Sequence, residues 1–252
     1  MYYTKITFTP LEKLEITEDN VEDMDITSAI WGYTGDLLRN GQIYQNDKVL
    51  IHNDNVFQAF FFMPELDSLD EKYCNEYVNG SFIRIKERCE IAVEVLGRNT
   101  IVNPVCSCND SSWYILYALK KDAFSPIVCG DCLKMIPTYK LPKMEIPAHI
   151  QSEIGWLADY YLIDQLWMYC GFDRFTYRQM SDIKSTLSKS GREICSAYEN
   201  AIGKPFYYFL YYHSNSKKIW KTCPDCGGEW KLKDNIGNLS FKCDICRLVS
   251  YG

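Results

Sequence analysis

The alternation of apolar and polar residues predicts a mixture of strands and helices in the first hundred residues. β-Branched and aromatic positions predict strands over residues 2–9, 48–51, 55–63 and 90–96. Helical spacing is found over residues 26–38 and 66–88, and Asn79-Gly80 is expected to interrupt the second stretch. Strands and helices that intermingle in this way predict a small α+β sandwich.

The middle of the chain is predicted to be helical and to end in a buried strand. Apolar residues recur every three or four positions over residues 147–170. Thr176-x-x-Gln179 and Ser190-x-x-Glu193 fit the capping-box pattern, so each is expected to start a short helix, the second ending at Gly203. Residues 205–213 are apolar on both faces, which predicts a central strand.

Four cysteines near the C-terminus have the spacing of a zinc ribbon. Cys223-Pro-Asp-Cys226 and Cys243-Asp-Ile-Cys246 are separated by 16 residues, and the sequence between them predicts a short β-hairpin. Four thiolates at about 2.3 Å close the tetrahedral shell of Zn²⁺, so the metal would be structural. The alternative is a disulfide framework, which belongs to secreted proteins. The sequence therefore predicts one zinc ion here.

A second group of cysteines lies upstream, as Cys106-Ser-Cys108 and Cys129-Gly-Asp-Cys132. Its spacing is compatible with a second zinc site, although Cys-x-Cys is the less usual half. A thioredoxin-like redox pair would need a following helix, whereas two prolines predict that residues 135–142 are extended. Core cysteines without metal are the remaining alternative. We therefore treat this group as a candidate second zinc site.

Composition and charge limit the class of protein. The 252 residues are 47% hydrophobic and carry a net charge of −6, and no apolar run approaches the roughly 20 residues of a membrane span. The first residues lack the pattern of a signal peptide, so we expect a cytoplasmic protein that does not contact a membrane. Three domains are predicted, namely an α+β domain over 1–142, a helical segment over 143–213 and the ribbon over 214–252.

Part of the sequence resembles a bacterial domain-of-unknown-function family. Cys129-Gly-Asp-Cys132 with residues 136–142, residues 203–212, and the two ribbon motifs with their flanking residues carry the resemblance, which covers about residues 100–250. The family is described as zinc-ribbon-containing and as a candidate nucleic-acid-binding protein, and no catalytic residue comes with it. The first hundred residues carry no comparable signature.

The chain departs from the family pattern at one position. The family pattern has Leu-Tyr-Arg-Leu-Pro where this chain has Thr138-Tyr-Lys-Leu-Pro. An arginine can bind phosphate with two parallel hydrogen bonds and a lysine cannot, so the departure weakens a phosphate site at Lys140.

Nucleic-acid binding through the ribbon is the first functional hypothesis. Residues from Ser214 onward carry a net charge of +3, so the rest of the chain carries −9. Trp230 would stack on a base, or alternatively would pack against Phe241 across the hairpin. The basic residues expected to contact phosphates are Lys231, Lys233, Lys242 and Arg247.

Protein binding is the second hypothesis, and catalysis the third. Seven acidic residues between positions 12 and 25 form either a solvated face or a docking surface for a basic partner. An immunity or antitoxin-like protein that blocks a toxin would fit this charge. The chain has three histidines, no glycine-rich phosphate loop and no catalytic triad motif, so we expect no enzyme activity.

Overall fold

The computed structural model describes residues 1–12, 21–44, 49–53, 55–99, 105–118, 124–142, 150–211 and 221–252. The chain divides into two compact units. Unit 1 consists of Met1–Val105 with Pro137–Leu141, and unit 2 of Cys106–Ile136 with Pro142–Gly252. This division differs from the boundaries at 142 and 213 expected from the sequence, because the upstream cysteines, the helices and the ribbon share one unit.

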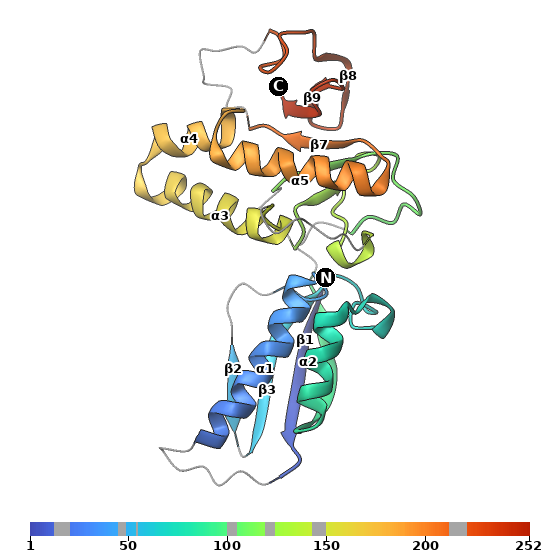
Figure 1. Ribbon diagram of the computed structural model, residues 1–252, viewed down its shortest axis with the longest axis vertical. Helices are drawn as coiled ribbons and strands as arrows, with labels where there is room; N and C mark the ends of the chain where they lie inside the picture. The colour runs from blue at the N-terminus through green and yellow to red at the C-terminus, as the bar shows by residue number, and fades with distance from the viewer. Residues whose placement is uncertain are drawn as a thin grey trace. The chain divides into compact units, whose positions relative to one another are not determined.

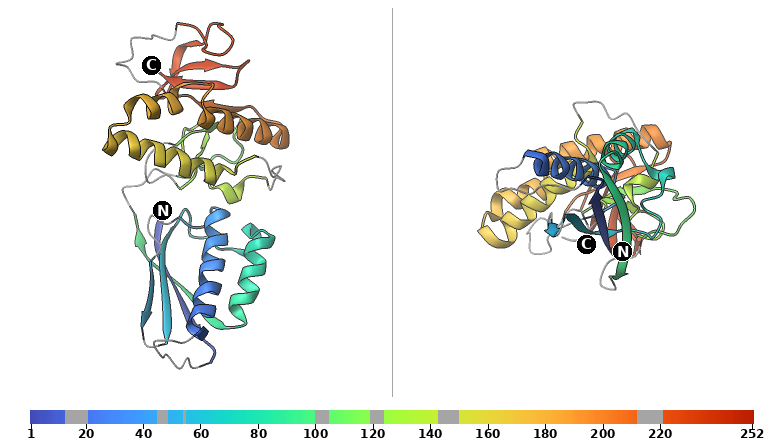
Figure 2. Two further views of the ribbon diagram at one scale, coloured as in Figure 1. Left: turned by 60° about the vertical axis from the view of Figure 1, so that its left-hand side comes forward. Right: turned by 90° about the horizontal axis from the view of Figure 1, so that it is seen from below.

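Unit 1 is an antiparallel sheet covered by two helices on one face (Figures 1 and 2). The strand order is β2-β3-β1-β4, which with the element order βαββαβ is the ferredoxin-like topology. Its elements are β1 (Tyr2–Pro10), α1 (Val21–Arg39), β2 (Leu50–Asn53), β3 (Val56–Met63), a 3₁₀ turn (Glu71–Tyr73), α2 (Glu76–Lys86) and β4 (Cys89–Arg98).

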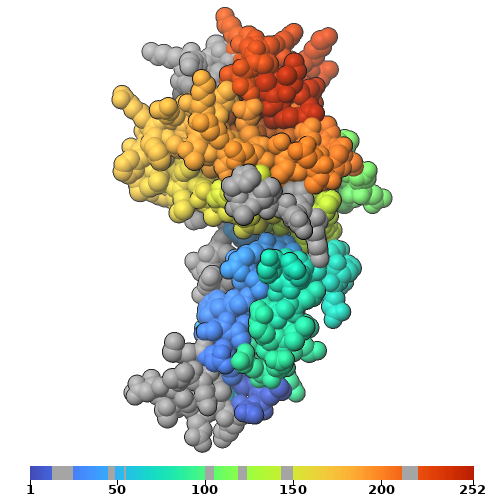
Figure 3. Space-filling model, in the orientation of Figure 1, coloured from blue at the N-terminus to red at the C-terminus, as the bar shows by residue number. Residues whose placement is uncertain are grey.

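The core of unit 1 lies between the sheet and the helices. Along β3 every second residue is buried, and Phe57 and Phe61 pack with Ile6 of β1 and Leu37 of α1. In the space-filling view α1 and α2 form one continuous surface over this face (Figure 3). The predicted interruption at Asn79-Gly80 was wrong, because Asn75 caps α2 by accepting a hydrogen bond from the Val78 N–H and the helix continues through Gly80.

A short downstream segment returns to unit 1. Residues Thr138–Lys140 form a 3₁₀ turn rather than a fully extended chain. The Tyr139 hydroxyl donates to Glu65 Oε2 at 2.9 Å, and Lys140 forms an ion pair with the same carboxylate. Lys140 is therefore engaged within unit 1.

Unit 2 is a six-stranded mixed sheet with three helices (Figure 1). The strand order is β6-β5-β7-β10-β9-β8, in which β7 is parallel to both of its neighbours. Its elements are β5 (Tyr114–Leu116), β6 (Ile127–Cys129), α3 (Glu153–Cys170), α4 (Asp173–Ser181), α5 (Thr186–Ile202), β7 (Phe206–Phe209), β8 (Lys231–Ile236), β9 (Leu239–Cys243) and β10 (Leu248–Tyr251).

The C-terminal ribbon is part of this sheet rather than an appended module. The last strand, β10, follows the second cysteine pair and pairs with both β9 and β7. Leu248 and Val249 are fully buried there, and the Ser250 hydroxyl donates to the Leu210 carbonyl at 2.7 Å. The α+β class with a C-terminal four-cysteine group is confirmed, and β7 is a central strand as predicted.

Helices α4 and α5 begin earlier than the capping boxes predicted. Ser152 and Ser185 are the N-caps of α3 and α5, since their hydroxyls accept from the N–H groups of Gly155 and Ser188. Thr176 and Ser190 lie inside α4 and α5 instead. Pro147, from which the long helix was expected to begin, lies outside the described residues.

Candidate metal centres

The C-terminal cysteines meet at one point, as the sequence predicted. The Sγ atoms of Cys223, Cys226, Cys243 and Cys246 all lie within 4.8 Å of one another. A tetrahedral ion with metal–sulfur bonds of about 2.3 Å places its sulfurs about 3.8 Å apart. The Cys226 and Cys243 sulfurs are separated by 3.8 Å, which matches this distance.

The upstream cysteines form a second group of the same kind. The Sγ atoms of Cys106, Cys108, Cys129 and Cys132 also lie within 4.8 Å of one another. All four are free thiols, and Cys108 is exposed while Cys106 and Cys132 are half-buried. They are therefore not a set of core cysteines, and the two groups are compatible with two metal ions.

Three of the cysteine turns share one backbone conformation. The Cys129 N–H donates to the Lys134 carbonyl and the Leu133 N–H to the Cys129 carbonyl. Cys223, Gly227 and Gly228 repeat this pair of hydrogen bonds. The residue after the second cysteine has a left-handed φ in each turn, as in Leu133 (56°), Gly227 (74°) and Arg247 (53°).

This turn directs backbone N–H groups toward the first sulfur. The Cys246 N–H donates to Cys243 Sγ at 3.4 Å. In the separate Cys106-Ser-Cys108 segment, the Cys108 N–H donates to Cys106 Sγ at the same distance. Such hydrogen bonds are the usual surroundings of metal thiolates. Glycine adopts a left-handed φ without strain, whereas Leu133 and Arg247 do so at a cost. Non-glycine residues in this conformation support a functional constraint on both groups.

Hydrogen bonds favour one thiolate in each group. The Gly228 N–H, with a hydrogen bond from Cys246, lowers the pKa of Cys226 to about 7. Burial would raise the pKa of Cys129, but hydrogen bonds from the Ser111 hydroxyl and from the N–H groups of Cys132 and Asp131 outweigh it and lower the pKa. Burial raises the pKa of Cys106 and Cys246. The positive charge of a bound cation would therefore be needed to stabilise all four cysteines of each group as thiolates.

Aromatic and charged side chains connect the surroundings of the two groups. Gly130, between the upstream ligands, lies against the Trp113 ring, and a Cβ there would come within 2.1 Å of the ring. Trp113 meets Tyr207 edge-on at 5.1 Å. The Lys242 ammonium lies over both rings, and the Tyr207 hydroxyl donates to Asp244 Oδ1 at 2.5 Å. Asp244 stands between the ligands Cys243 and Cys246.

The residues predicted to bind nucleic acid occupy different environments. Trp230 is 2% exposed and its ring stacks on Phe241 at 4.8 Å, so it packs across the hairpin and is not placed to stack on a base. Arg247 donates three hydrogen bonds to the Glu199 carboxylate, at 2.7, 2.8 and 3.0 Å, and Lys242 pairs with Asp244. Lys231 and Lys233 are exposed on β8.

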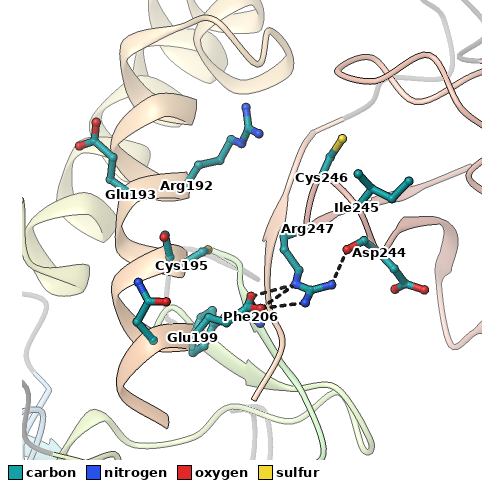
Figure 4. Close-up of a pocket in the computed structure, with 11 residues that line it drawn as sticks. Arg192, Glu193, Cys195, Glu199, Phe206, Asp244, Ile245, Cys246 and Arg247 are labelled. Atoms are coloured by element: carbon teal, nitrogen blue, oxygen red, sulfur yellow. Dashed lines mark hydrogen bonds and ion pairs between the residues drawn. The ribbon is translucent and has the colours of Figure 1, made fainter. Parts of the chain in front are cut away.

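A cavity of about 490 Å³ lies between α5 and the turn from Asp244 to Arg247 (Figure 4). The ligand Cys246 and the Arg247–Glu199 pair line it. Its other arginine, Arg192, pairs with Asp225 at 2.5 Å. Because both arginines are paired with carboxylates, the cavity has little excess positive charge to attract an anion.

Ile245 stands out on the turn beside this cavity. It lies between the ligands Cys243 and Cys246 and is 86% exposed, the most exposed large apolar side chain among the described residues. Of the four cysteines outside the two groups, Cys89 and Cys195 are buried, Cys74 is half-buried and Cys170 is exposed. No helix in the described part of the chain is long and apolar enough to cross a bilayer.

Three family models match the chain, each described as a domain of unknown function. They cover residues 1–97 (DUF8589), 108–211 (DUF2310) and 213–251 (DUF8594). The expected resemblance of residues 100–250 to domains of unknown function is thus confirmed. The first hundred residues match a separate family model. The descriptions name neither a metal nor a nucleic acid.

Two uncharacterized proteins of Haemophilus influenzae are similar to the chain. One is 31% identical over 253 residues, which covers 94% of each chain. The other is 38% identical over 144 residues, covering 55% of this chain and 70% of the relative. No solved structure matches significantly. Since the first match extends over nearly all of both sequences, the chain belongs to the same family as that Haemophilus influenzae protein.

Proposed function

We propose that the chain is a non-catalytic binding protein stabilised by two structural zinc ions. The observation that supports this proposal is the pair of four-sulfur groups, each with all sulfurs within 4.8 Å. Four thiolates select Zn²⁺ among the common closed-shell ions and leave no open coordination position for a substrate or an activated water. In this proposal each zinc holds a surface in place and does not react.

Metal analysis of the purified protein tests this proposal. We expect two equivalents of zinc per chain, falling to about one in C226S and to about one in C132S, because a four-cysteine site loses most of its affinity with one ligand. C170S is the matched control, since Cys170 is exposed and belongs to neither group. Fewer than two equivalents in the unmodified protein, or iron in place of zinc, would contradict the proposal.

A protein partner fits the surface held by the C-terminal zinc better than a nucleic acid does. Ile245 projects from a turn fixed by two metal ligands, beside the cavity along α5. An exposed apolar side chain on a rigid support is typical of a protein contact. In the part of the ribbon that the structure describes, Lys221, Lys231 and Lys233 are exposed, while Lys242 and Arg247 are engaged in ion pairs.

Nucleic-acid binding is kept as a second candidate because of one feature of unit 1. Tyr3 of β1 and Phe60 and Phe62 of β3 cluster on the sheet face opposite the helices, with Tyr3 at 5.0 Å from Phe62. Aromatic residues on the two central strands of a four-stranded sheet stack bases in RNA-recognition domains. Residues 1–105, however, carry 18 acidic and nine basic side chains, and Lys5 on this face pairs with Glu94.

Titration with a fluorescent single-stranded oligonucleotide decides between these candidates. Because residues 1–105 carry a net charge of −9, we expect the oligonucleotide to bind with a Kd no lower than about 100 µM at 150 mM salt. Tight binding that weakens with salt and is lost in Y3A/F60A would favour the nucleic-acid candidate over the protein candidate. K231A/K233A is the control that reports binding through the ribbon instead.

A further inference from the structure

The edge of the unit 1 sheet at β4 is unusually open. Among the described strands, β4 pairs with β1 on one side and is the outer strand on the other. It is ten residues long, has no proline, and is exposed from Ala92 to Arg98. Val93 is 50% exposed and Val95 is 44% exposed. A long apolar edge is a template for pairing with another strand.

The opposite edge strand of the same sheet, β2, is too short to pair extensively with another chain. β2 has four residues, Leu50–Asn53, so it offers few backbone groups for pairing. On β4 the protective features are the exposed charged residues Glu90, Glu94 and Arg98 and a bulge at Leu96, where the register to β1 shifts between Thr4 and Tyr3. Before this bulge, Glu90 to Val95 form a regular strand whose outer backbone groups can accept a partner.

The sequence of this regular part is compatible with its own antiparallel copy. When two copies of one sheet pair edge to edge and keep the same face up, opposite residues share a face, so the centre of symmetry falls on a residue. A centre at Ala92 places Glu90 opposite Glu94, and a centre at Glu94 places that residue opposite itself. Like charges directly opposite each other are destabilising.

A centre at Val93 avoids both conflicts. Val93 then lies opposite Val93 of the second copy, Ile91 opposite Val95, and Ala92 opposite Glu94, whose charge is already paired with Lys5 at 2.5 Å. The three β-branched pairs share the helix side of the sheet, because Ile91, Val93 and Val95 pair with Phe8, Ile6 and Thr4 of β1. A centre at Ile91 would leave the exposed Val95 without an opposite residue in β4, and it would place the buried Cys89 opposite Val93.

We propose that a second copy of this chain pairs with β4 in antiparallel register centred on Val93, which gives a two-fold dimer with a continuous eight-stranded sheet. The helix side supplies further apolar surface. Phe82 of α2 packs against Tyr33 of α1 at 5.5 Å, so the opposite flank of α2 faces away from α1 (Figure 1). Tyr77 lies on that flank and is 68% exposed. The proposal does not depend on zinc or on the binding proposed above.

The first test is the oligomeric state of the full chain. Light scattering coupled to size exclusion is expected to show a dimer whose population rises with concentration. V93K places two ammonium groups opposite each other on the symmetry axis and is expected to weaken the dimer about tenfold or more. I51K is the matched control, since Ile51 is 45% exposed on the opposite edge strand, and should leave the dimer unchanged.

The second test measures the register. Directly opposite side chains in an antiparallel pair have Cβ atoms about 4.5–5.5 Å apart, close to the separation that a disulfide needs. With zinc bound, mild oxidation of V93C should give a dimer linked through residue 93 of both copies, identified by peptide mass. A92C is the control and should crosslink much less, because its partner residue is Glu94.

The outcomes separate clearly. A monomer at all concentrations up to about 1 mM would overturn the proposal and would leave the β4 edge to a different protein. A dimer that V93K does not weaken, or one that crosslinks better through A92C than through V93C, would also overturn it. None of these results bears on the zinc content, so a failure here is distinguishable from a failure of the zinc proposal.

Discussion

At the scale of single residues, left-handed backbone positions identify the cysteine turns more sharply than the cysteines alone. Glycine occupies this position after Cys226, as Gly227, but Leu133 and Arg247 occupy the equivalent positions after Cys132 and Cys246. Sequence patterns assign such positions to glycine, so they cannot detect the turn when another residue adopts it. The backbone of the upstream group therefore strengthens a site for which spacing alone left alternatives open.

A buried carboxyl gives a prediction at the same scale. Glu153, at the first turn of α3, is 8% exposed and hydrogen-bonded to the Tyr198 hydroxyl, and burial raises its pKa above its usual value. The folded protein then binds this proton more tightly than the unfolded chain does. The stability from this group is complete below the unfolded pKa of about 4.3 and is lost as pH rises through the folded pKa.

Glu153→Gln removes this dependence while keeping a group that can accept from Tyr198. The free energy of unfolding of E153Q relative to the unmodified protein should therefore rise as the pH increases above about 4.3 and should level off once the pH exceeds the folded pKa of Glu153. Urea unfolding at several pH values measures the difference. E193Q, at an exposed position of α5, is the control and should show no such trend. If the difference in the free energy of unfolding between E153Q and the unmodified protein does not change with pH, burial does not raise the pKa of Glu153.

At the scale of elements, the close packing of α5 on β7 fixes the helical layer of unit 2. Gly191 lies inside α5, where an added Cβ would come within 2.3 Å of Tyr208 and 2.8 Å of Trp156 Nε1. Trp156 in turn donates from Nε1 to the Leu187 carbonyl at 3.1 Å. Hydrophobic periodicity predicted that this stretch is helical, but it could not show which neighbour requires a glycine.

Replacing glycine with alanine should have opposite effects in the two units. In a helix the change usually stabilises by up to about 1 kcal/mol. Gly80→Ala in α2 should follow this rule, because the nearest atom to its Cβ is Arg84 Nη1 at 3.6 Å. Gly191→Ala should destabilise by about 1–3 kcal/mol through overpacking. Denaturant unfolding of both variants measures this, and a G191A protein as stable as the unmodified one would contradict the packing.

At the scale of the whole molecule, the two groups of cysteines belong to unit 2, and the described part of unit 1 contains no comparable cluster of metal ligands. The turn from Cys129 to Cys132 follows β6, and the turn from Cys243 to Cys246 connects β9 to β10. Zinc should therefore stabilise one unit and leave the folding of the other unchanged.

Metal removal should expose this difference. Structural zinc in small modules contributes roughly 10 kcal/mol, so a strong chelator is expected to lower the unfolding temperature of unit 2 by more than about 10 °C. Tryptophan fluorescence follows unit 2, because five of the six tryptophans lie there and Trp31 lies in unit 1. Calorimetry should show a second transition that the chelator does not move. Equal shifts in both transitions would contradict this division of the chain.

The amino-acid sequence by itself determined the strands of unit 1, the central position of the strand after Pro205, and the four C-terminal ligands. These follow from local periodicity and from a cysteine spacing that one ion can satisfy. The helix start at Ser185 was missed because Ser190-x-x-Glu193, five residues downstream, fits the capping-box pattern and Ser185 does not. The start at Ser152 was missed because the helix was expected to begin at Pro147.

Only the tertiary structure decided what depends on contacts between distant segments. The parallel pairing of β10 with β7 merges the ribbon into a six-stranded sheet, and the burial of Trp230 and the ion pair of Arg247 remove them from the surface expected to bind nucleic acid. A sequence states which side chains are present and how they alternate. Which of them pair, and which remain exposed, depends on the competition among all segments for the same core.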